Sequence, residues 1–292
     1  MASWATSFPS SFLPTRDGGR TQVLSSRWRH LWGSSPLHLG LGAHGHSSIP
    51  AGDISRILSA HPGPARRFSV PEDCFDYRDM PDATTLDSWF RSPALDGLQE
   101  LEFHHASHPY LPPPSLPASV HRFSSTLRVA SFGGFCFLYG DGGGLHLPVL
   151  EQLSLTDVII SERSLGVLLA ACPVLQSLLI DGGIGCSSVE IVSPTLRSIG
   201  ISSGIGLQRL IIKDAPWLER LLLDSIGSKE ITVSVISAPK LHALGPLSAH
   251  NIRLEFGTTI FQAHLSLDAV IESMKCFPCL EKLYIEVTVF LN

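Results

Sequence analysis

The sequence has few charged residues, few cysteines and no long apolar run. Asp, Glu, Lys and Arg make up 16% of its 292 residues, against roughly 25% in an average soluble protein, so we expect poor solubility without a partner. The absence of any run of 18 apolar residues argues against a membrane-spanning helix. Six cysteines in so long a chain do not make a disulfide framework, which favours reduced thiols and a cytoplasmic or nuclear location.

Charge is unevenly distributed along the chain. Residues 1–67 contain seven arginines and two aspartates, a net charge of +5, whereas the remainder carries −10. This polarity predicts two functional parts, but a charge of +5 over 67 residues is too weak for a nucleic-acid-binding arm. The first residues lack the basic segment of a secretory signal and are short for a transit peptide.

A repeat organises most of the chain. The pattern Pro-x-Leu-x-x-Leu/Ile occurs six times, starting at Pro148, Pro173, Pro194, Pro216, Pro239 and Pro278. Successive prolines are 25, 21, 22, 23 and 39 residues apart, and four of these intervals fall within the period of leucine-rich repeats. The earlier stretches "LDGLQELEF" and "TLRVASF" are diverged copies that lack the proline.

The spacing within each repeat predicts short stacked strands. The last two apolar residues are two apart and therefore point to one face of a strand, and neighbouring repeats must stack to bury that strip. The β-branched runs "SVEIVS", "RLIIKDA" and "ITVSVISA" predict strands on the convex side, where "SLGVLLAAC" predicts a helix. We therefore predict an α/β fold, an irregular leucine-rich-repeat solenoid. It is irregular because the usual corner Asn or Cys is replaced by Val158, Gly183, Gly204, Ile226 and Thr288.

The stretch "RTQVLSSRWRHLW", residues 20–32, predicts a short amphipathic helix. Leu24, Trp28, Leu31 and Trp32 form one apolar stripe. The basic residues lie off this stripe, which disfavours nucleic acid, and membrane binding needs a longer, more cationic helix. Two readings stay open, a partner protein or packing against the following solenoid.

Residues 12–39, "FLPTRDGGRTQVLSSRWRHLWGSSPLHL", resemble the second half of a plant F-box of the class that precedes irregular leucine-rich repeats. The resemblance continues through "LDSWFRSPALDGLQELEF", "PYLPPPSLPASVHRFSSTLRVASFGG" and "LQRLIIKDAPWLERLLLD". It implies a substrate receptor of an SCF-type ubiquitin ligase, which binds a Skp-family adaptor and through it a cullin, while the repeats hold a protein target. The residues that match the adaptor-binding part of the F-box are Leu13, Pro14, Val23, Leu24, Trp28, Leu31 and Trp32.

The sequence departs from this family at both ends. It lacks the Leu-Pro-Asp segment and first helix of an F-box, and it stops at "VTVFLN", before the additional C-terminal segment of many relatives. We expect a truncated helical F-box at 1–40, a linker or first irregular repeat at 41–74 and a solenoid at 75–292. The alternative function is a free-standing repeat scaffold that has lost adaptor binding.

The strand assignment also predicts which residues face a target. These outward positions of the concave strands are Gln152, Ser154, Thr156, Ser177, Leu179, Asp181, Ser198, Gly200, Ser202, Arg220, Leu222, Asp224, Lys282, Tyr284 and Glu286. Because aromatic residues and Arg dominate interface energetics, Tyr284 and Arg220 are the predicted anchors, supported by an exposed Leu179 and Leu222.

Enzyme, metal and cofactor motifs are weak. "GISSG" at 200–204 fits the hydrolase pattern and is followed by Asp214 and His242, but the next repeat begins on schedule and no HGGG-type oxyanion segment exists. "CFPC" offers two of the four ligands that zinc needs, and "HHASH" with His44 and His46 lacks cysteines or carboxylates nearby. "GDGGG" lacks the Lys-Ser/Thr of a phosphate loop, and "PYLPPPSLP" predicts a rigid connector. We expect no enzymatic activity, metal or cofactor, and neither nucleic acid nor membrane as a partner.

Overall fold

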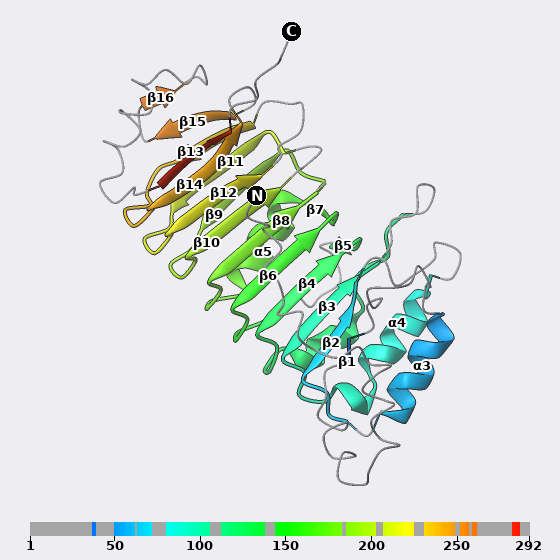
Figure 1. The fold of residues 1–292 in the computed structure, drawn as a ribbon. Helices are drawn as coiled ribbons and strands as arrows, with labels where there is room; N and C mark the ends of the chain where they lie inside the picture. Colours follow the sequence, from blue (N-terminus) through cyan, green and yellow to red (C-terminus); the bar gives the residue numbers. More distant parts are fainter. Residues whose placement is uncertain are drawn as a thin grey trace. The chain divides into compact units, whose positions relative to one another are not determined.

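The computed structural model describes the chain in segments. These are residues 37–38, 50–61, 63–71, 80–105, 112–137, 144–182, 185–202, 207–224, 231–248, 252–256, 259–261 and 282–286. They fall into two compact units, the first within 1–136 and 145–150 and the second within 137–144 and 151–292 (Figure 1). The division predicted from the sequence, at residues 40 and 74, stays a prediction.

The first unit contains a parallel sheet with helices between its strands. Its strands pair in the order β1 (Leu37–His38), β2 (Arg67–Val70), β3 (Glu100–His104) and β4 (Val129–Gly133). Its helices are α3 (Ala51–Ala60), α4 (Ala83–Phe90) and the 3-10 turns η3 (Pro93–Leu95) and η4 (Ala118–Phe123). The strands β3 and β4 lie in "LDGLQELEF" and "TLRVASF", so the reading of these stretches as diverged repeats is confirmed.

Aromatic side chains fill the core of the first unit. The ring of Phe103 on β3 lies 5.5 Å from Phe90, 5.9 Å from Phe135, 6.3 Å from Trp89 and 6.4 Å from Phe68, measured between centroids. All five rings are buried, and the edge-to-face contact with Phe90 is a favoured aromatic geometry. The indole of Trp89 also donates a hydrogen bond to Ser55 Oγ at 2.7 Å, which joins α4 to α3.

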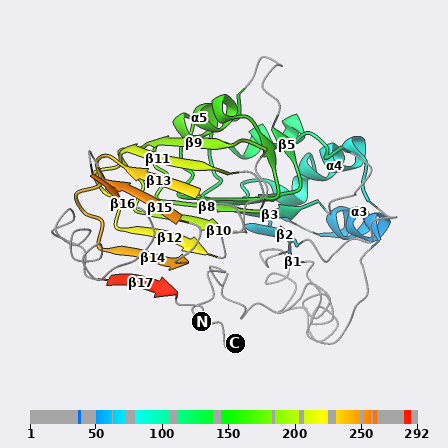
Figure 2. The same ribbon diagram turned by 90° about the horizontal axis from the view of Figure 1, so that it is seen from above.

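The second unit contains two layers of parallel strands. The first layer pairs β6 (Gln152–Thr156), β8 (Ser177–Asp181), β10 (Ser198–Ser202), β12 (Arg220–Asp224), β14 (Ala243–Ser248) and β17 (Lys282–Glu286). The second layer pairs β9 (Ser188–Val192), β11 (Arg209–Asp214), β13 (Ile231–Val235) and β15 (Ile252–Phe256), with β16 (Thr259–Phe261) antiparallel at its edge. Figure 2 shows β9, β11 and β13 above β8, β10 and β12.

Two short strands and one helix complete the description. The strand β5 (Cys136–Phe137) lies at the boundary of the units, and β7 (Ile159–Ile160) precedes α5 (Glu162–Ala170). The predicted helix in "SLGVLLAAC" is α5, and the predicted convex strands are β9, β11 and β13, so these assignments are confirmed. Ser161 caps α5 by accepting a hydrogen bond from the Ser164 N–H at 3.1 Å.

The core of the second unit is aliphatic and repeats from strand to strand. The register aligns Leu153, Leu178, Ile199 and Leu221 across β6, β8, β10 and β12, and all four are buried. The second layer adds buried residues in the same way, namely Val189, Ile191, Leu210, Ile212, Val233 and Val235. The irregular leucine-rich-repeat solenoid predicted from the proline period is therefore confirmed.

Two neighbouring turns after first-layer strands contain residues with positive φ, an aspartate in one and a glycine in the other. Asp157 follows β6 with φ of 48°, and Gly182 follows β8 with φ of 73°. A Cβ atom on Gly182 would collide with the Asp157 carboxylate, so the glycine provides both the left-handed backbone and the space. The corner position predicted to hold Asn or Cys in a regular repeat is the buried Val158.

Candidate protein-binding face

The predicted target-facing residues lie on the side of the first layer that faces away from the core. We call this side the core-distal face of the second unit. Gln152, Ser177, Ser198 and Arg220 form its first row, Ser154, Leu179, Gly200 and Leu222 its middle row, and Thr156, Asp181, Ser202 and Asp224 its last row. Exposed or half-buried residues alternate with buried ones along β6 and β8. The structure therefore brings twelve of the fifteen predicted residues into one array.

The middle row is more closed than the sequence predicts. Leu179 is half-buried, but Leu222 is 7% exposed, so the prediction of an exposed Leu222 is wrong. Gly200 lies between the two leucines in the register and has no side chain to separate them. A Cβ on Gly200 would lie 2.9 Å from Leu179 Cδ1, so Leu179 occupies the space that a side chain there would take. The row is a shallow apolar strip.

The first and last rows differ in charge. Arg220 is exposed at the start of β12, whereas Asp181 lies at the end of β8. Asp224 also ends its strand, although its side chain lies outside the described part. The predicted Lys282, Tyr284 and Glu286 lie on β17, which pairs with β14, and their side chains are likewise outside it. The predicted role of Tyr284 as an anchor stays a prediction.

Three side chains beside Arg220 were missed from the sequence. Trp217 is 45% exposed in the turn before β12, with Lys240 Nζ 3.2 Å and Arg197 Cζ 5.8 Å from its ring centroid. We call Arg197, Trp217, Arg220 and Lys240 the basic rim. Trp217 and Lys240 each follow a repeat proline, so stacking places their turns next to one another; this shared offset was the available signal.

The corresponding face of the first unit is occupied by its own polar side chains. Arg67 on β2 lies within 3.5 Å of Glu102 and 3.7 Å of Glu100, both on β3. The Ser69 hydroxyl donates a hydrogen bond to Glu102, and Arg67 and Ser69 are both buried. This network was also missed, because the segment around β2 contains no Pro-x-Leu repeat that would fix its register with β3.

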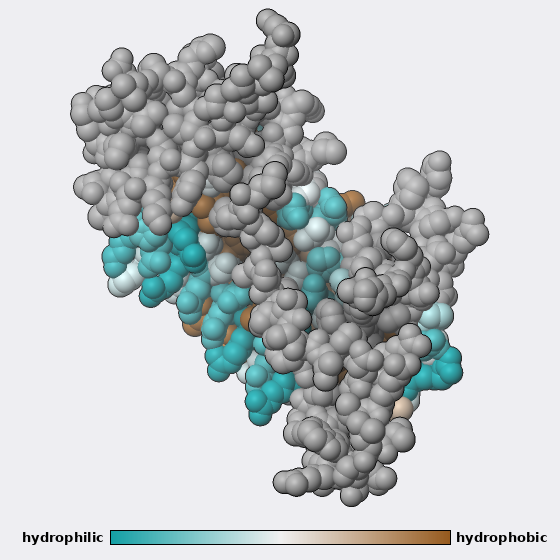
Figure 3. All heavy atoms as spheres, in the orientation of Figure 1, coloured by the Kyte–Doolittle hydropathy of each residue, from teal (hydrophilic) through white to brown (hydrophobic). Residues whose placement is uncertain are grey.

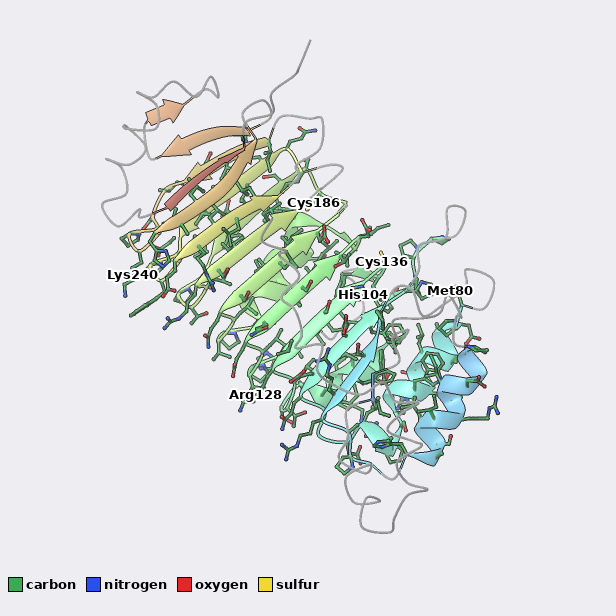
Figure 4. All side chains as sticks on the ribbon, viewed as in Figure 1. Met80, His104, Arg128, Cys136, Cys186 and Lys240 are labelled. Atoms are coloured by element: carbon green, nitrogen blue, oxygen red, sulfur yellow. The ribbon has the colours of Figure 1, made fainter. Side chains whose placement is uncertain are left out.

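One further hydrogen bond extends this arrangement to β4. His104 Nε2 lies 2.8 Å from the hydroxyl of Ser131, which is buried. His104 is the first histidine of "HHASH", and Figure 4 labels it; three residues of that motif, together with His44 and His46, lie outside the described part. Among the described residues no group of three or more His, Cys, Asp or Glu is arranged to hold a metal ion.

The residues considered for catalysis lie in or next to strands of the second unit. Ser202 ends β10, and the next described residues lead into the strand β11 rather than into the helix that a nucleophile elbow requires. Asp214 ends β11, and His242 precedes β14. The "CFPC" motif lies outside the described residues, as does most of "GDGGG".

Burial suppresses the reactivity of two cysteines of the second unit. It raises the pKa of the Cys172 thiol to about 12, and burial together with the nearby Glu162 charge raises the pKa of Cys186 to about 11. Burial also raises the pKa of Cys136 (Figure 4). A thiol with so high a pKa is a poor nucleophile at neutral pH, because the thiolate is the reactive form.

The predicted adaptor-binding residues, from Leu13 to Trp32, all lie outside the described part of the chain. Family comparison bears on them instead. Residues 86–268, more than half of the chain, match the family model described as "FBD-associated F-box protein At5g56370, LRR repeats". The chain belongs to this plant F-box/leucine-rich-repeat family. The resemblance inferred from the sequence is therefore confirmed.

Similar proteins from Arabidopsis thaliana are named as F-box or F-box/LRR-repeat proteins. The chain is 30% identical to "Putative F-box protein At3g44060" over 70% of its own length and 48% of the relative. It is 29% identical to "F-box/LRR-repeat protein At3g03360" over 66% and 40%, and 26% identical to "F-box/LRR-repeat protein At4g14103" over 80% and 63%. The matched part thus spans about half the length of these relatives. No solved structure matches the chain.

None of the described helices is sufficiently long and apolar to cross a lipid bilayer.

Proposed function

We propose that this chain is the substrate-recognition subunit of an SCF-type ubiquitin ligase. In this proposal residues 12–32 dock on a Skp-family adaptor linked to a cullin, and the core-distal face of the second unit binds a protein target. The proposed role is non-catalytic. The proposed location is the cytoplasm or nucleus, which a fluorescent fusion of the chain can test. Membership of the F-box/leucine-rich-repeat family supports the adaptor contact, since the relatives' names contain the F-box.

The core-distal face is the observation that carries the target-binding part. Every second residue of β6 and β8 is buried in the core, so the intervening residues point away from the core and form a mainly polar surface with a short apolar strip. Protein-binding surfaces combine such apolar strips with a polar border and a few large anchors. Arg220 on this face and Trp217 in the turn that precedes β12 are side chains of this kind.

Co-purification with a purified Skp-family adaptor tests the ligase part. The full chain should retain the adaptor, and a Trp28→Ala/Trp32→Ala variant should lose it, because both indoles lie on the apolar stripe of the F-box stretch. Trp217→Ala is the matched control: it removes an exposed indole of the second unit and should leave adaptor recovery unchanged. Recovery that survives the double substitution, or fails with a folded parent chain, contradicts adaptor docking by this stretch.

The second candidate is a free-standing repeat scaffold that binds a partner without reaching the ligase. The same core-distal face supports it, because target binding does not require the adaptor. A folded chain that binds a target but no adaptor would favour this candidate. A hydrolase role is tested by Ser202→Ala, which should leave function unchanged.

A further inference from the structure

We propose that the basic rim, Arg197, Trp217, Arg220 and Lys240, binds an acidic segment of the protein target, which runs across the turns that precede β10, β12 and β14. This inference rests on target binding by the second unit and specifies the chemistry of the target. It does not depend on adaptor binding.

The rim is assembled by the stacking of successive repeats. Arg197 precedes β10, Trp217 precedes β12 and Lys240 precedes β14, and backbone hydrogen bonds from Glu219 N to Arg197 O and from His242 N to Glu219 O hold these turns in line. Two cations therefore flank the same indole, one from the preceding turn and one from the following turn. Cation–π contact holds their side chains near the ring, which reduces the entropy that binding must remove.

The charge of the rim is positive on a chain whose net charge is −5. Arg197 is paired with Glu219 at 3.0 Å, so the three cations exceed the one carboxylate by two charges. Lys240 and Arg220 are both exposed. Figure 3 shows hydrophilic side chains along this edge of the second unit, and Figure 4 labels Lys240 there.

The opposite row sets the path of the partner. Asp181 ends β8, so an acidic segment that crossed the face along this strand would meet its carboxylate. A path along the rim avoids it. Extended by one turn, to the turn that precedes β8, this path also passes Val174, which is 40% exposed and occupies the same position after its proline as Trp217. The partner segment should therefore combine carboxylates with at least one apolar side chain.

Nucleic acid is the less favourable occupant of the same rim. Single-stranded nucleic acid also uses aromatic and cationic side chains, but it needs a positive groove that follows several phosphates. Here the cations span three turns, and Asp181 lies on the same face. An excess of two charges suits a few carboxylates better than a long phosphate backbone.

Fluorescence anisotropy of the full chain tests the proposal without any adaptor. The probe is a fluorescein-labelled peptide in which glutamates flank one leucine, and the same peptide with glutamines in place of the glutamates is the neutral control. Arg220→Gln/Lys240→Gln removes two rim charges. Arg209→Gln/Lys213→Gln removes two exposed charges from β11 in the second layer and is the matched control, since both variants change the net charge equally.

We expect the rim variant to bind the acidic peptide about tenfold more weakly, as the loss of two surface charge contacts predicts. The β11 variant should stay within about twofold, and Trp217→Ala should also weaken binding. Equal losses in the two double variants, no binding of the acidic peptide by the parent, or tighter binding of single-stranded oligothymidine would each overturn the proposal. Circular dichroism of every variant excludes unfolding as the cause. Because no adaptor is present, failure here leaves the adaptor result standing.

Discussion

The two units are built from the same strand-and-turn repeat, but they differ in the side chains that fill the core and in those on the opposite face. In the first unit the core is aromatic, and the opposite face is occupied by the Arg67, Ser69 and Glu102 network. In the second unit the core consists of aligned leucine, isoleucine and valine side chains. The opposite face has mostly small polar side chains that are exposed or half-buried, apart from the leucines of its middle row. A face whose charged and polar groups bind one another contributes to the fold, whereas a face that leaves them to solvent is available to a partner.

The largest expected effect is in the aromatic core. Phe103→Ala removes the ring that contacts four other aromatic rings, and we expect a loss of about 4 kcal/mol in the free energy of unfolding. Leu178→Ala in the aliphatic ladder should cost about 3 kcal/mol, since less surface is removed from the core. Urea unfolding monitored by circular dichroism measures both. A smaller cost for Phe103→Ala than for Leu178→Ala would contradict the aromatic core of the first unit.

The glycine turns of the two units should differ in whether a second substitution rescues them. Gly134→Ala and Gly182→Ala each place a side chain on a backbone with positive φ, and both should cost about 3 kcal/mol. The new Cβ at 134 collides with the backbone oxygen of His105, whereas at 182 it collides with the Asp157 side chain. Asp157→Gly should therefore recover part of the loss at 182. Gly97→Ala, with positive φ but open space, is the control for the backbone effect alone.

Loss of one charge should affect stability differently on the core-distal face of the second unit and on the corresponding face of the first unit. Glu102→Gln removes the carboxylate that faces the buried Arg67, and we expect a loss of about 2 kcal/mol in stability. Arg220→Gln should change stability by less than about 0.5 kcal/mol, because the side chain is exposed. Thermal unfolding of the two variants beside the parent measures the difference. Equal changes would show that the second face is as much a part of the fold as the first.

Much of the second unit could be predicted from sequence, because the prolines fix the register of each strand. The repeat places apolar residues two apart, at Leu153 and Leu155 and again at Leu178 and Ile180, and this spacing assigns buried and outward residues without any knowledge of the neighbouring strands. The burial of Leu222 could not be predicted in the same way, since alternation along β12 says nothing about side chains on the neighbouring strands, such as Leu179 above Gly200. The Trp217–Lys240 contact joins residues of different repeats, so it becomes visible when the turns are stacked.

The first unit was less predictable for a physical reason. Its repeats lack the proline that marks the corner, and Arg67 and Glu102 are 35 residues apart with α4 between their strands. Nothing local indicates that an arginine in "ARRFSV" faces a carboxylate in "QELEF". The strands themselves were predictable in "LDGLQELEF" and "TLRVASF", whereas the partners across strands were not.

A further prediction concerns the reactivity of Cys172 in the second unit. Burial favours the neutral thiol of Cys172, so its folded pKa of about 12 exceeds the ordinary value of 9.0. This contribution to stability is fully present below about pH 9 and is lost as the pH rises toward 12. Alkylation by iodoacetamide at pH 8, followed by mass spectrometry, should label Cys172 in the folded chain much more slowly than in urea. Equal rates would contradict its burial.

If the chain joins an adaptor to an acidic target segment, it must hold both at once, and a single bridging measurement tests this. Beads that carry a Skp-family adaptor are incubated with the chain and then with the fluorescein-labelled glutamate peptide. We predict that the beads retain fluorescence, that Trp28→Ala/Trp32→Ala removes both chain and fluorescence, and that Arg220→Gln/Lys240→Gln removes the fluorescence alone. Beads that hold the parent chain but no peptide would contradict binding of an acidic segment by the adaptor-bound chain.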